Sequence, residues 1–127
     1  MLVAAGVEIY RAPDMNVLAN PGVTSLQLLS PRNCPGADAT ITKVTVEPSA
    51  GQPRHVHESA EQVWIVLQGA ATLLLAGSES QTISAGDVVR TPAGKTHGLQ
   101  NDGAEPFVYL AVTTPPVDFG YAYREQR

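Results

Sequence analysis

Glycine and proline interrupt the chain at short intervals, and this spacing limits the folds that it can adopt. The segments between them are brief and apolar or β-branched: TSLQLLS (24–30), ATITKVTVE (39–47), QVWIVLQ (62–68), ATLLLAG (71–77), SQTIS (80–84), DVVRT (87–91), THGLQ (96–100) and FVYLAVTT (107–114). Short strands separated by turns are typical of an all-β sandwich or barrel. No segment carries a long apolar stripe at the helical period, so we expect little helix.

The length of 127 residues predicts a single domain, 1–127. The strand pattern places the barrel core at about 39–114, with an N-terminal arm, 1–38, and a C-terminal tail, 115–127. Strands such as VWIVL are apolar on both faces, so we expect cover from the barrel interior on one side and from a second sheet or subunit on the other.

Charge and composition exclude several classes of protein. The formal net charge is -4, and the 8 basic residues are scattered, so no positive stripe is available for nucleic acid. No run of about 18 apolar residues exists, so we expect no membrane contact. The first residues lack the basic flank of a signal peptide, and Cys34 has no disulfide partner, so we expect a cytoplasmic location.

The histidines suggest a metal site. His55 and His57 stand two residues apart, and on a strand such side chains share a face at less than about 7 Å. Two imidazoles placed in this way can bind one ion at about 2.0–2.1 Å each. The neighbouring Glu61 and Gln62 offer oxygen donors that suit Mn, Fe, Ni or Zn. Taken alone, such a pair is more often a polar strand end than a metal site.

A second stretch, GDVVRTPAGKTHGLQN, strengthens the interpretation as a metal site. Its Gly86, Pro92, Gly94, His97 and Asn101 match all five positions of the motif Gly-x5-Pro-x-Gly-x2-His-x3-Asn. The chain therefore resembles the cupins, and among them the small single-domain members. The resemblance implies a double-stranded β-helix, or jelly-roll, barrel of six to eight strands with one divalent metal ion in its mouth.

The first cupin motif, Gly-x5-His-x-His-x3,4-Glu-x6-Gly, is matched more loosely, because only three residues separate Gly51 from His55. Its fourth-ligand position is also not plainly glutamate. Six residues separate Gln62 from Gly69, as the motif requires, whereas seven separate Glu61 from Gly69. A shift of one residue on a strand reverses the facing, so the count favours Gln62 over Glu61.

The resemblance then implies metal ligands at His55, His57, Gln62 and His97, with Glu61 as the alternative to Gln62. Three neutral imidazoles and a neutral amide leave the ion's charge uncompensated by the protein. Such a site favours anionic oxygen ligands, and its metal would act mainly as a Lewis acid and a template. We expect Asn101 to tie a turn through its amide rather than bind metal.

Three further side chains are candidates for the substrate pocket. Trp64 lies two residues after Gln62, on the same face of the expected strand, so it either forms a wall of the pocket or packs in the core. Tyr109 could line the pocket from a neighbouring strand, or pack in the core. Arg54 points opposite to His55 on a regular strand, so it holds an anion at the rim or is simply solvated.

Function follows less directly, because one fold hosts many chemistries. We expect a metal-dependent enzyme that acts on a small anionic or enolisable molecule, as a dioxygenase, an isomerase or a cyclase; no catalytic acid or base can be named. The alternatives are a binding module without turnover and a barrel that never meets metal. We expect a homodimer, from the two-faced apolar strands and the aromatic tail.

Overall fold

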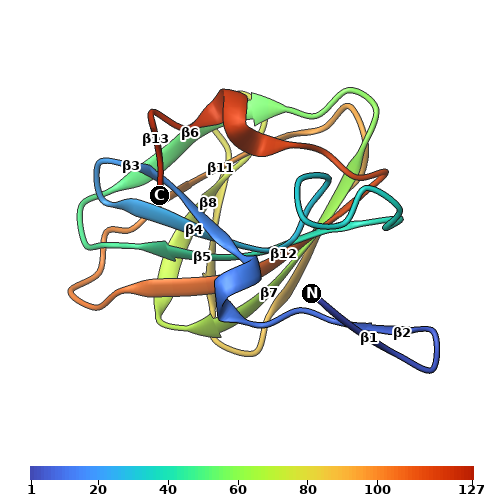
Figure 1. The fold of residues 1–127 in the computed structure, drawn as a ribbon. Coiled ribbons are helices and arrows are strands. Elements are labelled where there is room, and N and C mark those ends of the chain that lie inside the picture. The colour runs from blue at the N-terminus through green and yellow to red at the C-terminus, as the bar shows by residue number, and fades with distance from the viewer.

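The computed structural model describes residues 1–127, which form thirteen strands and two short 3-10 helices. Two sheets make up the body of the molecule, and a small hairpin projects from it at the N-terminus (Figure 1). The all-β prediction is therefore confirmed. Neither helix has the length and apolarity that a membrane crossing would need.

The larger sheet has seven antiparallel strands. Their order across the sheet is β10 (Val88–Thr91), β7 (Glu61–Gln68), β12 (Phe107–Thr114), β5 (Thr40–Val46), β4 (Val23–Leu29), β3 (Asn16–Asn20) and β13 (Glu125–Gln126). β12 lies between β7 and β5 and pairs with both of them along most of its length. Because it is interior to the sheet, nearly all of its FVYLAVTT sequence is apolar or β-branched.

The smaller sheet has four strands and carries most of the candidate site. Their order is β6 (Gly51–Val56), β11 (Thr96–Gln100), β8 (Ala70–Leu74) and β9 (Ser80–Ser84). At the start of β6, Gly51 faces Gln100, and a Cβ at position 51 would lie 2.5 Å from the Leu99 carbonyl oxygen. Glycine at this position therefore permits the close approach of β6 and β11.

Alternating side chains of the two sheets meet to form the core. β5 buries every second residue of TITKVTV, and β7 buries Gln62, Trp64 and Val66 in the same alternation. Twelve side chains form one apolar cluster, in which Trp64, Phe107 and Leu99 are each at most 2% exposed. This packing fixes which face of each strand looks inward.

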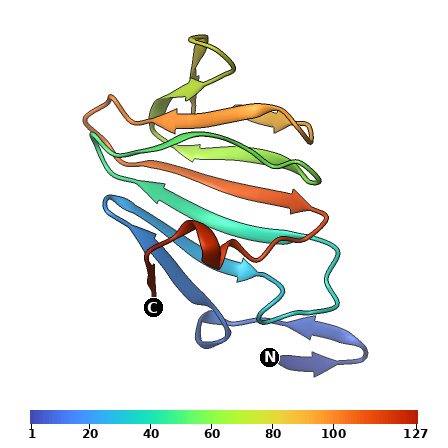
Figure 2. The ribbon, with the colours of Figure 1, turned by 90° about the horizontal axis from the view of Figure 1, so that it is seen from above.

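The sheet extends beyond the expected barrel core of 39–114 on both sides. β3 and β4 come from the expected arm, and β13 comes from the expected tail. Only the hairpin of β1 (Leu2–Ala4) and β2 (Val7–Ile9) forms a sheet of its own, and it lies beside the body in Figure 2. The first 3-10 helix, η1 (Ala12–Asp14), connects this hairpin to β3.

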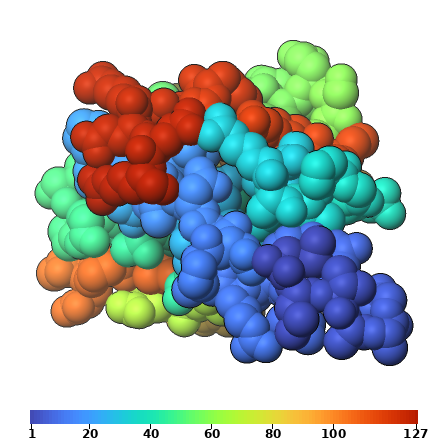
Figure 3. Space-filling view, in the orientation of Figure 1, coloured from blue at the N-terminus to red at the C-terminus, as the bar shows by residue number.

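The C-terminal segment, residues 115–127, packs back onto the barrel. It contains the second 3-10 helix, η2 (Phe119–Ala122), and ends in β13, which pairs with β3. The space-filling view shows this segment, in red, spread over one part of the surface, well apart from the N-terminal hairpin (Figure 3). The aromatic tail therefore covers its own barrel.

Candidate metal centre

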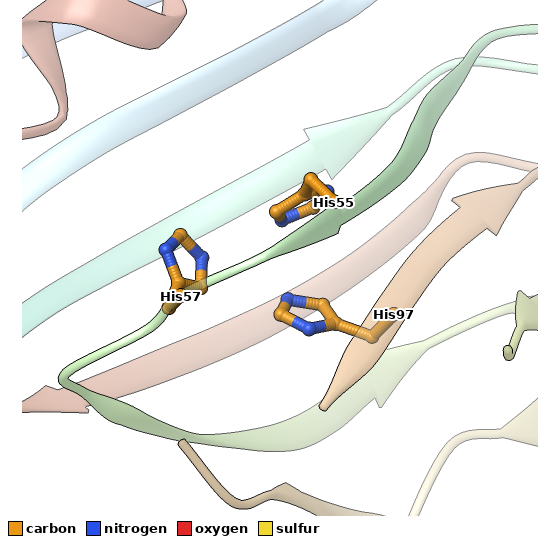
Figure 4. A group of neighbouring side chains, drawn as sticks. All are labelled: His55, His57 and His97. Carbon is orange, nitrogen blue, oxygen red and sulfur yellow. The ribbon is translucent and has the colours of Figure 1, made fainter. Parts of the chain in front are cut away.

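Two neighbouring strands bring the three histidines together. His55 in β6 lies directly opposite His97 in β11 in the strand register, and His57 follows β6 by one residue. All three rings point into a common space, as Figure 4 shows. The ring centroids are 4.3 Å apart for His55 and His97, 5.0 Å for His55 and His57, and 5.3 Å for His57 and His97.

One ligand nitrogen from each ring lies within 4.8 Å of those of the other two. Ligands on opposite sides of one ion would be about 4.2 Å apart, given metal–nitrogen bonds of about 2.1 Å. The His55 and His57 rings are only half-buried, so packing does not enclose them on all sides. The triad could therefore hold a single metal ion.

The environment of His97 indicates independently that a metal ion could bind among the three histidines. Its side chain is 1% exposed, and neither of its ring nitrogens has a hydrogen-bond partner. Burial, followed by the nearby charges of His55 and His57, lowers the pKa of His97 to about 4. Since buried polar groups are almost always paired, a neutral imidazole with free nitrogens in a group of three fits a metal ligand.

The other two rings are also disposed to bind as neutral ligands. His55 Nδ1 lies 2.7 Å from the Pro53 carbonyl oxygen, and as a donor to it leaves the Nε2 lone pair free. His57 is half-buried beside the ring of Phe119, 5.7 Å away between centroids. Burial, and then the charge of His55, lowers the pKa of His57. Deprotonated imidazoles are the form that metal binding requires.

Gln62 and Glu61 face opposite sides of the sheet. Gln62 is 6% exposed; its Nε2 donates to Thr113 Oγ1 at 2.9 Å, and its Oε1 accepts from Trp64 Nε1 at 2.7 Å. Glu61 instead makes an exposed ion pair with Arg90, at 2.7 Å. The interior placement of Gln62 agrees with the residue count back from Gly69, and its carbonyl oxygen keeps a second lone pair.

A cavity of about 290 Å³ opens beside the triad. Its lining includes His55, His57 and Gln62, together with Phe119, whose ring lies beside that of His57, and the exposed Tyr121. No aspartate, glutamate, lysine or arginine is among the lining residues. The cavity walls therefore contribute no fixed charge from these four residue types.

The three pocket candidates lie in different places. Tyr109 lines the cavity; its hydroxyl donates to Gln52 Oε1 at 2.9 Å, and burial raises its pKa, which keeps it protonated. Trp64 lies in the core, edge-on to His97 at 5.5 Å between ring centroids, and is not part of the lining. Arg54 is outside the cavity, because its Nε donates to the Leu75 carbonyl oxygen at 2.7 Å.

Asn101 has the predicted structural role. It is fully buried, its Nδ2 donates to the carbonyl oxygens of Val46 and Glu105, and its Oδ1 accepts from the Gly103 amide. These bonds tie the loop after β11 to the end of β5. Three hydrogen bonds therefore hold the Asn101 amide in this structural role.

Sequence reasoning missed two side chains near the site, Gln52 and Thr113. Gln52 lines the cavity between the hydroxyls of Tyr109 and Tyr123. Thr113 lies opposite Gln62 in the register of β12 and β7, where it holds the amide. Neither residue belongs to a motif, and only the strand pairing reveals their positions.

Comparison with curated proteins finds a partial likeness. Mannose-1-phosphate guanylyltransferase 2 of Escherichia coli O157:H7 is 28% identical over 74 residues, which is 58% of this chain. The match spans only 15% of the length of that relative. The likeness therefore concerns one part of a much longer protein.

Solved structures share the fold over most of the chain. A protein with a double-stranded β-helix domain from Klebsiella pneumoniae superposes with a TM-score of 0.71 at 23% identity, covering 87% of this chain and 91% of that one. A sugar phosphate isomerase from a cupin superfamily, from Silicibacter pomeroyi, gives a TM-score of 0.65 at 27% identity, covering 74% of this chain and 60% of that one. The predicted double-stranded β-helix is thereby confirmed.

The family is settled by the barrel sequence. Residues 42–113, from β5 to the end of β12, match the family described as Cupin domain. That range contains the three histidines and the strands that position them. The chain belongs to the cupin family.

Proposed function

We propose that this cupin is a metal-dependent enzyme that acts on a small anionic or enolisable molecule. The observation that carries the proposal is the buried, unpaired His97 imidazole, which lies beside two other imidazoles at the end of a cavity. His55, His57 and His97 would hold one divalent ion of Mn, Fe, Ni or Zn, with Gln62 as the fourth ligand.

The charge of this ligand set supports the substrate class. Gln62 and the three histidines are all neutral as ligands, so a bound divalent ion would keep its full charge. When bound, the metal would supply Lewis-acid polarisation and a template for substrate oxygens. A carboxylate or an enolate would offset that charge, whereas a neutral alcohol would not.

The chain's own residues would orient the ligand set and exclude water. Thr113 and Trp64 fix both ends of the Gln62 amide, so it cannot rotate freely. Tyr109 is fully committed as a protonated donor to Gln52. No carboxylate lines the cavity to act as a general base, which favours a reaction that begins from an already acidic substrate.

The same lack of a base supports the second candidate, a binding module that holds metal and ligand without turnover.

The first experiment is elemental analysis of protein purified without added metal, with the His97→Ala variant as the comparison. About one ion per chain in the wild type and almost none in the variant would support the centre; equal contents would contradict it.

Turnover then separates the two candidates. Protein loaded with Fe, Mn, Ni or Zn would be incubated with a panel of carboxylic acids and diketones, with oxygen uptake and product formation followed. Product that disappears on chelation would support the enzyme. A metal-dependent thermal shift with no product across the panel would favour the binding module.

We also propose that two copies associate. Ile65, Leu67 and Val88 are exposed on the outer side of the β7–β10 edge, and the β1–β2 hairpin exposes Leu2 and Val7. A two-stranded hairpin is marginally stable alone in water, so a second copy packed on these apolar surfaces would stabilise it.

A further inference from the structure

The C-terminal segment forms a built wall of the cavity. Phe119, Tyr121 and Tyr123 all line it. The segment is fixed at several points: Asp118 pairs with Arg32 at 3.0 Å, and Asn20 accepts from the Arg124 amide while donating to the Ala122 carbonyl oxygen. These contacts with the barrel therefore fix the position of the aromatic side chains in the cavity wall.

The two amide side chains of Gln52 and Gln62 in the cavity wall are hydrogen-bonded to neighbouring side chains. Gln52 accepts from Tyr109 at 2.9 Å and donates to Tyr123 at 3.5 Å. The Gln62 amide is held by Trp64 and Thr113. A sugar needs many free hydrogen-bonding groups, and a phosphate needs cations or clustered amides. The cavity offers no lysine or arginine to a phosphate.

We propose that the ligand of this cavity has two unlike ends. One end carries two neighbouring oxygens that reach the histidine triad, and the other is an uncharged ring that lies against Phe119 and Tyr121. These two aromatic residues are then determinants of specificity. The inference rests on the proposed function, and it names the substrate class as a ring-bearing chelator rather than a phosphorylated sugar.

The size of the cavity agrees with such a ligand. A dry apolar cavity of about 150 Å³ accepts benzene. The volume here is about 290 Å³, which leaves room for one ring together with a chelating head. Phe119 is 8% exposed beside His57, whereas Tyr121 is 74% exposed, so Tyr121 forms the rim of the ring-binding end.

Calorimetric titration of metal-loaded, desalted protein tests the inference directly. Acetylacetone and benzoylacetone share the same 1,3-diketone head and differ by a methyl or a phenyl group. Burial of the phenyl predicts about 10- to 100-fold tighter binding of benzoylacetone. Mannose 1-phosphate, the third probe, is expected not to bind at millimolar concentration. Metal content is measured in every sample.

Variants locate the ring-binding end. Tyr121→Ala removes an exposed side chain without threatening the fold, and Phe119→Leu keeps most of the packing volume. Both are expected to reduce the preference for benzoylacetone at least threefold, and Tyr121→Ala, at the exposed residue, is expected to leave metal content and acetylacetone affinity unchanged. Tyr10→Ala, in the separate hollow beside the N-terminal hairpin, is the matched control and keeps the full preference.

The outcomes distinguish the inference from the proposed function. Equal affinities for the two diketones on metal-loaded protein, or binding of mannose 1-phosphate at least as tight as that of benzoylacetone, would overturn the inference and leave the metal centre standing. An unchanged preference in both cavity variants would also overturn it. Protein that takes up no metal, or binds neither diketone when loaded, would remove the proposed function as well.

Discussion

Replacing His97 with phenylalanine separates metal binding at this position from packing. Wild-type His97 buries two ring nitrogens that have no partner within the protein. A buried unsatisfied polar group costs about 1–3 kcal/mol. Phenylalanine keeps an aromatic ring against Trp64 but has no polar atom to leave unpaired. With chelator present, we therefore expect the metal-free variant to be at least as stable as the metal-free wild type.

Excess metal is expected to make the wild type more stable than the His97→Phe variant. At a free metal concentration one hundred times Kd, binding stabilises the native state by about 2.7 kcal/mol. An unfolding entropy of about 2.1 cal/mol/K per residue gives about 270 cal/mol/K for this chain. The ratio predicts a rise in Tm of about 10 °C for the wild type. His97→Phe lacks one ligand of the triad, so we expect no rise at the same concentration.

Differential scanning calorimetry in chelator and in excess metal measures both effects. Leu99→Met is the matched control, because Leu99 is fully buried two residues along the same strand and the swap conserves volume. It is expected to keep the full response to metal. An equal rise in the His97→Phe variant would place the metal elsewhere. A metal-free variant several degrees less stable than wild type would refute the assigned cost of the unpaired nitrogens.

Three further predictions follow from named side chains. Metal-free wild type should lose about 3 kcal/mol of stability as pH falls from 6.5 to 4. The pKa of His97 is about 4 in the folded protein and 6.5 for an unperturbed histidine, so the unfolded chain binds the proton first. Denaturant titrations of wild type and His97→Phe at both pH values measure the difference. Gln62→Glu should raise metal affinity about tenfold and weaken diketone binding, because a carboxylate offsets the charge of the ion. Glu61→Gln, on the outer face of the sheet, should change neither affinity. Competition with a chromogenic chelator measures the metal affinity, and equal effects of the two substitutions would exclude Gln62 as a ligand. Val88→Glu should convert a dimer at micromolar concentration to a monomer in light scattering, and a wild-type monomer would contradict the proposed association.

The sequence by itself determined the bounds of several strands and the residues that supply imidazole. β9, β11 and β12 begin and end where the short segments between turn residues predict, because strand and turn preferences are local properties of the chain. The interior facing of Gln62 was predicted by counting along one strand, which needs only the two-residue period of side chains.

Only the tertiary structure decided what surrounds the histidines. His55 meets His97 through the pairing of β6 with β11, and β6 carries too many polar residues to stand out as a strand. The tail residue Phe119 reaches His57 across 62 positions of sequence, and Gln52 reaches Tyr109 in the same non-local way. Such contacts depend on how strands pair and fold back, which no local pattern encodes.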